Sequence, residues 1–227
     1  MGISNYVVRN VNTFPQSLPG LLTRKRRKKA QSIKAFNAAK VLSVGELLSP
    51  TSALPERSIL LGRCADGLPF LISMKDPDLG AILIRGNRGC GKTHQLQVMV
   101  EGAMQTHQPH ELQITVICHN PSIWAGYQQQ RHSAKYFQGV YAWYDPAAGD
   151  HIQRLTEMVE ARREGSQDGP ANLVILDDMV FVDTLSCDAQ VNLRWLLEYG
   201  AQSQVWLVAA MNDSQSKRLP FWLEVFR

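Results

Sequence analysis

Long apolar runs are missing from this sequence, and their absence argues against a transmembrane protein. No stretch reaches the roughly 18 consecutive apolar residues that a membrane-spanning helix needs. The first ten residues, MGISNYVVRN, lack the apolar core of a secretory signal peptide. Tyr6 stands where the N-myristoylation pattern requires Ser or Thr, so no lipid anchor is expected. We therefore expect a cytoplasmic protein without a membrane span.

Metal-binding and disulfide motifs are missing as well. The four cysteines include no CxxC pair, which argues against a zinc site and against a secreted disulfide framework. The six histidines show neither HxH nor HxxxH spacing. Because 44% of the 227 residues are hydrophobic and 19% are charged, we expect a globular protein with a real core. The scattered cysteines are expected to be reduced thiols.

Acidic residues are absent between positions 24 and 40, where eight Lys and Arg residues gather, six of them in RKRRKK at 24–29. The remaining 16 basic and 20 acidic residues give the rest of the chain a net charge of about −4, against +4 for the whole. Such a run binds DNA phosphates, acts as a targeting signal, contacts anionic lipid or forms a solvated tail. No aromatic residues interrupt RKRRKK at 24–29, so any binding to nucleic acid should be insensitive to base sequence.

Composition divides the chain near residue 57. Residues 1–57 contain four prolines, the basic run and little periodicity, which predicts a basic, partly disordered N-terminal arm with one or two short helices. Residues 58–227 begin with ILLG and PFLIS around ADG, which predicts a β-hairpin. Amphipathic helical segments then alternate with the apolar segments AILIRG, LQITVICH, VYAWYD, NLVILDD and VWLVAAM. This alternation predicts an α/β domain whose mostly parallel sheet has helices on both faces.

The octet GNRGCGKT, Gly86–Thr93, matches the phosphate-loop pattern G-x-x-x-x-G-K-[ST] between an apolar strand and a helix. Its glycines let backbone N–H groups face an anion at the positive end of the helix. We expect Lys92 to reach the β- and γ-phosphates of ATP and the Thr93 hydroxyl to ligate Mg²⁺. The predicted nucleotide-binding residues are Gly86, Asn87, Arg88, Gly89, Cys90, Gly91, Lys92, Thr93 and His94.

Two aspartates follow the apolar run LVIL. The pattern predicts a buried strand that carries Asp177 and Asp178 to the carboxyl edge of the sheet, where open α/β sheets bind ligands. Asp177 is expected to hold Mg²⁺ through water. Asp178 is expected to orient or deprotonate the attacking water.

The segment from ILLGRCADGLPFLISM through GNRGCGKT, with LVILDDM and VWLVAAMND, resembles the motor core of the FtsK-HerA ATPases over roughly residues 58–227. The resemblance implies a RecA-like P-loop NTPase that uses ATP and Mg²⁺ and forms a ring, usually hexameric, that moves double-stranded DNA. By position it assigns Lys92 and Thr93 to nucleotide and Mg²⁺, Asp177 to Mg²⁺ and Asp178 to catalysis. It also gives Asn212, after the last strand, a catalytic sensor role.

The sequence departs from this family in three places. The family usually has Glu at the position of Asp178 and Gln or Arg at that of Asn212, and a further edge strand and helix normally follow the last segment, LPFWLEVFR. A fragment, a minimal member and an inactive remnant are all compatible with that ending. An arginine from a neighbouring subunit completes the site of ring motors. Its candidates, each of which is also explained as a solvated charge, are Arg162, Arg163 and Arg218.

The resulting hypothesis is an oligomeric ATPase that couples hydrolysis to the translocation or packaging of double-stranded DNA. The alternative is an ATP-binding switch with slow turnover that acts on a protein partner. The shorter side chain of Asp178 favours this alternative.

Overall fold

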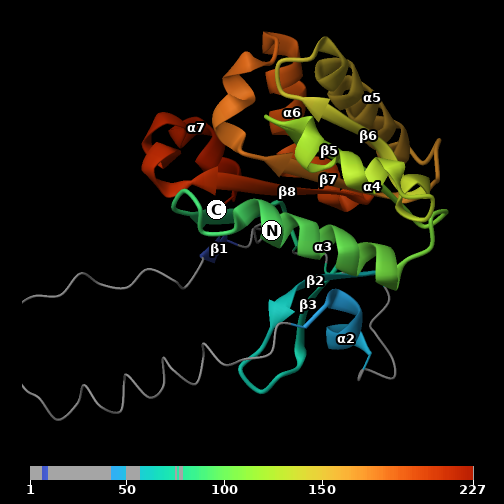
Figure 1. The fold of residues 1–227 in the computed structure, drawn as a ribbon. Helices are drawn as coiled ribbons and strands as arrows, with labels where there is room; N and C mark the ends of the chain where they lie inside the picture. The colour runs from blue at the N-terminus through green and yellow to red at the C-terminus, as the bar shows by residue number, and fades with distance from the viewer. Residues whose placement is uncertain (1–6, 10–41, 50–56, 75, 77–78, 227) are drawn as a thin grey trace, which may run out of the picture.

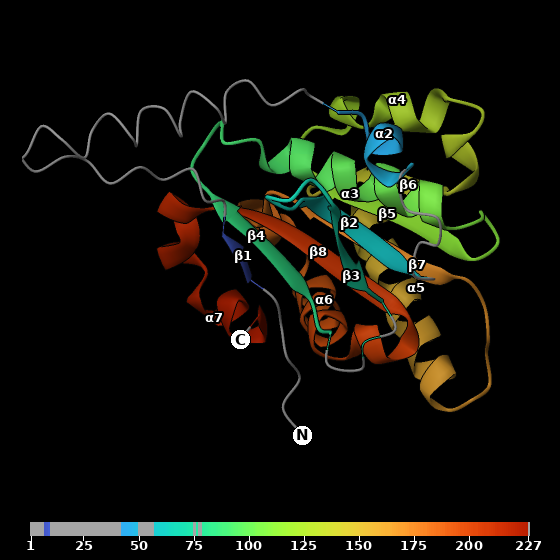
Figure 2. The ribbon, with the colours of Figure 1, turned by 90° about the horizontal axis from the view of Figure 1, so that it is seen from below.

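The computed structural model describes residues 7–9, 42–49, 57–74, 76 and 79–226. Its centre is a six-stranded sheet in the order β1-β4-β8-β7-β5-β6, in which every neighbouring pair runs parallel (Figure 2). In chain order, the strands of this sheet are β1 (Val7–Arg9), β4 (Ile82–Gly86), β5 (Leu112–Cys118), β6 (Phe137–Ala142), β7 (Ala171–Asp177) and β8 (Val205–Asn212).

Helices cover both faces of the sheet (Figure 1). One face carries α3 (Lys92–Thr106) and the hairpin of β2 (Ser58–Arg63) and β3 (Pro69–Ser73), and the other carries α5 (Pro146–Arg163) and α6 (Cys187–Tyr199). The shorter elements are α2 (Val44–Leu48), η1 (Pro121–Ile123), α4 (Ala125–Gln129), η2 (Ser133–Lys135), η3 (Met179–Thr184), η4 (Gly200–Ser203), η5 (Asp213–Arg218), α7 (Pro220–Leu223) and η6 (Glu224–Phe226).

Alternating side chains of the central strands enter two separate hydrophobic cores. In β4, Ile82 and Ile84 join the core on the α3 face, whereas Leu83 joins the core beneath α5 and α6. All seven residues of β7 are buried, as expected for a parallel strand covered on both faces. The predicted α/β fold with a mostly parallel sheet and helices on both faces is therefore confirmed.

The predicted hairpin forms a separate two-stranded antiparallel sheet, which packs on α3. The Thr106 hydroxyl donates to the Ser58 carbonyl over 3.1 Å. Gly102 of α3 lies so close to β2 that a Cβ atom there would come within 2.6 Å of the Leu60 Cβ. The hairpin thus braces the outer side of the helix that follows the phosphate loop.

The strand predicted at VYAWYD is displaced toward the amino end. β6 is Phe137–Ala142, and Trp143 already belongs to the turn into α5. The Asp145 carboxylate accepts a hydrogen bond from the Ala147 N–H, and Pro146 occupies the first helical position. An Asp cap followed by Pro is a strong helix start, so α5 begins several residues before the predicted segment HIQRLTEMVEARREG.

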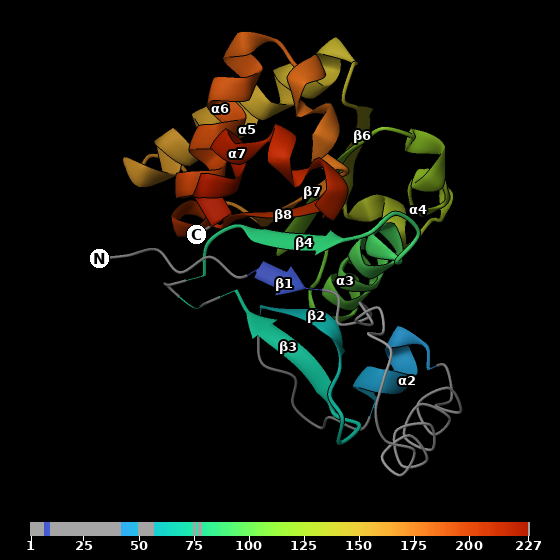
Figure 3. The same cartoon turned by 90° about the vertical axis from the view of Figure 1, so that its left-hand side faces the viewer.

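Two stretches of the predicted arm contact the domain. Val7–Arg9 forms β1 beside β4 (Figure 3), a strand that the sequence did not predict. Val44–Leu48 forms α2, whose buried side chains pack with Leu60 of the hairpin. The basic run at 24–29 lies outside the described residues, so the predicted division at residue 57 stays a prediction. Among the described residues, no helix combines the length and apolar character that crossing a bilayer requires.

Candidate nucleotide-binding site

The phosphate loop leaves β4 at Gly86 and enters α3 at Lys92. Gly89 and Gly91 adopt left-handed backbone angles, with φ of +77° and +89°, which side-chain-bearing residues rarely adopt. Gly91 caps the helix without any side-chain hydrogen bond, so the N–H groups of the first turn face outward unpaired by a capping side chain. This arrangement is typical of helix starts that bind anions.

The ammonium group of Lys92 folds back over the loop. Its Nζ donates to the carbonyl oxygens of Gly86, over 3.1 Å, and Asn87, over 3.0 Å. These carbonyls hold the cation at the centre of the loop, where a phosphate group would compete for it. Of the predicted loop residues, Gly86 and Asn87 therefore contribute main-chain oxygens to the loop's own structure.

A cavity of about 870 Å³ opens above the loop at the carboxyl ends of the strands. β8 places Asn212 directly beside Gly86 of β4, and β7 places Asp177 beside Cys118 of β5. Nine predicted site residues line the cavity: Arg88, Gly89, Gly91, Lys92, Thr93, His94, Asp177, Asp178 and Asn212. Cys90 is not among the lining residues, and its N–H instead donates to the Asn87 carbonyl.

Asp177 is buried and accepts hydrogen bonds from three side chains. The Thr93 hydroxyl donates to its Oδ1 over 3.0 Å, and the Trp124 indole N–H donates to its Oδ2 over 3.2 Å. The Trp143 indole N–H donates to its carbonyl oxygen over 3.0 Å. Burial raises the pKa of Asp177, while the hydrogen bonds from Trp124 and Thr93 oppose that rise. The sequence did not predict either tryptophan as a partner.

Asp178 differs from Asp177 in backbone and in surroundings. Its φ of +66° is unusual for a residue other than glycine. One of its carboxylate oxygens, Oδ1, is buried without a hydrogen-bond partner among the described residues. Strained backbone and an unpaired buried acceptor are both costly, and they cluster at functional sites. Asp178 itself is one of the residues that line the cavity.

Asn212 lies where the sequence predicted it, at the end of β8. Its side-chain oxygen accepts hydrogen bonds from the Ser214 N–H, over 3.2 Å, and the Ser214 hydroxyl, over 3.1 Å. These bonds begin η5 and fix the side chain at the rim of the cavity. A sensor role for Asn212 stays a prediction.

The oxygen donors present suit Mg²⁺. A hydroxyl and a carboxylate are hard ligands, and Mg²⁺ usually takes only one or two protein ligands together with phosphates and waters. Among the described residues, no group of three or more His, Cys, Asp or Glu side chains gathers as a self-sufficient metal site. Thr93 and Asp177 therefore fit a metal that arrives with a nucleotide better than a resident ion.

His119 is a cavity residue that the sequence analysis missed. It follows β5 directly, its ring stacks on Phe181 with centroids 4.0 Å apart, and Tyr144 meets it edge-on. The available signal was position, because the residue after a parallel strand lies at the same sheet edge as Asp177. The stack forms one wall of the cavity.

The three candidate trans-acting arginines have different surroundings. Arg162 donates to the carbonyl oxygens of Ser203 and Pro170, over 2.9 and 2.7 Å, so its guanidinium joins segments of its own chain. Arg163 lies over the rings of Trp195 and Tyr199. Arg218 is exposed at the end of η5, the helix that begins beside Asn212. This placement favours Arg218 among the three.

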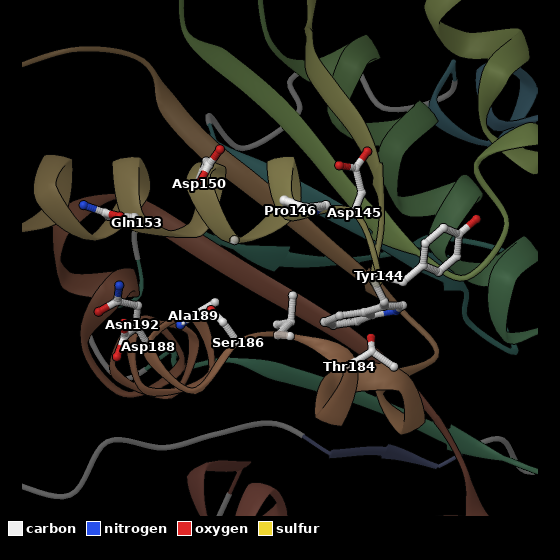
Figure 4. Close-up of a pocket in the computed structure, with 13 residues that line it drawn as sticks. Tyr144, Asp145, Pro146, Asp150, Gln153, Thr184, Ser186, Asp188, Ala189 and Asn192 are labelled. Atoms are coloured by element: carbon white, nitrogen blue, oxygen red, sulfur yellow. Dashed lines mark hydrogen bonds between the residues drawn. The ribbon is translucent and has the colours of Figure 1, made fainter.

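A second, smaller cavity of about 310 Å³ lies between the amino ends of α5 and α6 (Figure 4). Asp145, Asp150 and Asp188 line it together with Trp143 and Tyr144. Trp143 donates to the Asp177 carbonyl and Tyr144 meets His119 edge-on, so lining residues of the smaller cavity contact lining residues of the larger one.

No protein-family profile matches this chain, and no curated protein matches it. Several solved structures do match this chain. ATPases 2 and 3 of Thermomonospora curvata EccC, in complex with a signal sequence peptide, share 19% identity and a TM-score of 0.59 over 80% of this chain and 32% of theirs. The cytoplasmic domain of the Thermomonospora curvata type VII secretion ATPase EccC shares 20% identity with this chain and has a TM-score of 0.60. The match covers 83% of this chain and 21% of that domain. ATPases 2 and 3 of Geobacillus thermodenitrificans EssC share 16% identity with this chain and have a TM-score of 0.60. The match covers 78% of this chain and 37% of theirs.

This chain thus spans between about a fifth and two fifths of the length of these neighbours. The neighbours belong to the FtsK/SpoIIIE family of P-loop ATPases, and their low identity to this chain supports a conclusion about fold alone. The site geometry and the structural similarity lead to the same conclusion: residues 79–226 form a P-loop ATPase fold with its phosphate loop intact.

Proposed function

We propose that this chain is a Mg²⁺-dependent ATPase. The observation that carries the proposal is the 3.0 Å hydrogen bond between Thr93 Oγ1 and Asp177 Oδ1. It joins the end of the phosphate loop to the end of β7, so that a hydroxyl and a carboxylate meet beside the loop, as the Mg²⁺ ligands of P-loop NTPases do. The neighbouring structures, which are ATPase domains, support the same activity.

The residues divide the work of hydrolysis. The N–H groups of the loop and the first turn of α3 bind the phosphates, and Lys92 leaves the Gly86 and Asn87 carbonyls to neutralise the β- and γ-phosphates. Mg²⁺, held by Thr93 and through water by Asp177, would neutralise charge on the transferred phosphoryl group. Asp178, which lines the cavity, orients a water for in-line attack and accepts its proton.

The proposal also concerns the polymer on which this ATPase acts, which is either double-stranded DNA or a protein. The basic run at 24–29 favours double-stranded DNA, because six adjacent cations suit a phosphate backbone. The EccC neighbour solved with a signal sequence peptide favours a protein substrate. We propose DNA translocation as the first function to test and action on a protein partner as the second.

A homo-oligomeric ring is part of the same proposal. Arg218 is exposed at the end of η5, the helix that follows Asn212, and we propose it as the arginine that acts on a neighbouring copy's nucleotide. Mass measurement with and without a non-hydrolysable ATP analogue tests the assembly. A strictly monomeric protein under both conditions would remove the ring and the role of Arg218.

The decisive experiment measures ATP hydrolysis with and without double-stranded DNA at two salt concentrations. Replacing residues 24–29 by glutamine is the matched variant, because it removes the cations and keeps β1, which a deletion of the arm would also remove. DNA stimulation that fades with salt and in the variant supports a DNA motor. Turnover indifferent to DNA eliminates that function and leaves the protein substrate, whereas no turnover and no ATP binding would overturn the ATPase itself.

A further inference from the structure

The loop after β5 inserts one large side chain behind the metal-ligand carboxylate. Asn120 caps η1, its side-chain oxygen accepting from the Ser122 N–H and hydroxyl, and the chain then turns into α4 at Trp124. Trp124 is fully buried, with 0% of its surface exposed. It is not among the residues that line the nucleotide cavity. It therefore reaches the site only from behind, through Asp177.

The two oxygens of the Asp177 carboxylate have different partners. Oδ2 accepts from the Trp124 indole, 3.2 Å away, and Oδ1 accepts from Thr93, 3.0 Å away. A carboxylate at the end of a strand is free to rotate about its last bond unless a partner holds one oxygen. The indole N–H supplies that partner, and it keeps Oδ1 on the side of Thr93 and the phosphate loop.

The same segment is also fixed to the helix of the phosphate loop. One turn after Trp124, the Tyr127 hydroxyl donates to the Glu101 carboxylate of α3 over 2.7 Å. The Trp124 and Tyr127 rings contact each other, with centroids 5.8 Å apart. A short helix thus connects the strand that carries Asp177 to the helix that begins at Lys92.

We propose that Trp124 is a positioning residue that orients Asp177 for Mg²⁺ in the nucleotide complex. The inference rests on the proposed ATPase function. Partners behind a metal ligand fix its orientation, and their loss typically lowers metal affinity by about 10 to 100-fold. Asp177 holds Mg²⁺ through water in this proposal and the indole is a single neutral donor, so the effect belongs at the lower end of that range.

The test compares Trp124→Phe with Trp143→Phe in the full chain. Both changes remove an indole N–H that donates to Asp177, but only Trp124 donates to the carboxylate, whereas Trp143 donates to the main-chain carbonyl. The readout is Mn²⁺ binding, followed by its electron paramagnetic resonance, in the presence of a non-hydrolysable ATP analogue. Binding of the analogue in EDTA is the parallel measurement.

Trp124→Phe should weaken Mn²⁺ binding about 10-fold, and it should leave analogue binding in EDTA unchanged. Trp143→Phe should change the Mn²⁺ affinity far less. If Trp124→Phe does not fold, benzothienylalanine at position 124, which has the shape of tryptophan without its N–H, provides the same comparison. Equal Mn²⁺ affinity in the wild type and in Trp124→Phe, or in the benzothienylalanine variant, would overturn the positioning role. Failure of the wild type to bind analogue or Mn²⁺ would instead overturn the ATPase function on which it rests.

Discussion

The Thr93 hydroxyl and the Asp177 carboxylate lie 3.0 Å apart across 84 positions of sequence. The contact joins the two motifs that the sequence offered separately, a phosphate loop and a strand ending in two aspartates. The strand order explains it, because β4 and β7 both flank β8 and end at the same edge of the sheet. Four predictions follow from this geometry and from the surrounding packing.

Lys92→Ala should weaken ATP binding by roughly 10 to 100-fold, since hydrogen bonds to charged groups are worth about 1.5–3 kcal/mol. Its Nζ is held over the loop by the Gly86 and Asn87 carbonyls, so its loss removes the cation from the phosphate position. Titration with a fluorescent ATP analogue measures the effect. Lys135→Ala, an exposed lysine in η2, is the control. Wild-type affinity in Lys92→Ala would contradict the phosphate role.

Asp178→Asn should keep ATP binding and lower turnover by about 10² to 10⁴-fold, the usual contribution of a positioned acid or base. Asparagine tolerates the φ of +66° at this position, so the backbone should be preserved. Binding and steady-state hydrolysis are measured on the same preparation. Asp183→Asn, an exposed carboxylate of the same helix η3, provides the comparison. Unchanged turnover in Asp178→Asn would exclude this residue from catalysis.

Gly91→Ala should lower both ATP affinity and the melting temperature, although no atom lies within 4 Å of the added Cβ. The cause is the φ of +89°, because left-handed backbone costs an alanine about 1–2 kcal/mol. Gly126→Ala in α4 meets equally open space without a positive φ. It should be neutral or slightly stabilising. Equal effects of the two substitutions, by calorimetry and nucleotide titration, would show that backbone angle is not what the loop requires.

Stability should fall as the pH drops from about 6.5 to 4. Burial and the nearby Arg154 charge lower the pKa of His151 to about 4. Arg154 offers only donors, so Nδ1 of His151 is an acceptor and Nε2–H donates to Thr115. The unfolded chain binds a proton in this window and the folded chain does not, which costs up to about 3 kcal/mol.

Thermal melts across this pH range measure the effect of His151. Burial also lowers the pKa of His107, which contributes in the same direction. His151→Gln should therefore flatten the pH dependence without abolishing it, whereas His110→Gln, at an exposed position, should leave it unchanged. A profile in His151→Gln that matches the wild type would assign the acid sensitivity elsewhere.

Much of the fold was predictable because it follows from the pattern of residue types within short segments of the sequence. Four of the five predicted strands lie where the apolar runs indicated, and the loop from Gly86 to Thr93 was identified from residue types alone. The strand predicted at VYAWYD was displaced because the Asp145 cap and Pro146 start α5 directly after it, so Trp143 and Tyr144 form the turn before the helix instead of extending β6. β1 was missed because three residues carry too little pattern to be recognised.

Residue types and their spacing establish which chemical groups are present: a glycine-rich loop, a lysine, a hydroxyl and two carboxylates on an alternating α/β chain. Only the tertiary structure decided how those groups are held. It placed Trp124 and Trp143 on Asp177, left one oxygen of Asp178 unpaired, and used Arg162 to join carbonyl groups of its own chain. The difference lies in how far apart in the sequence the interacting residues are. Backbone preference and burial follow from neighbouring residues, whereas contacts between distant side chains depend on strand order and on the packing of loops at the sheet edge.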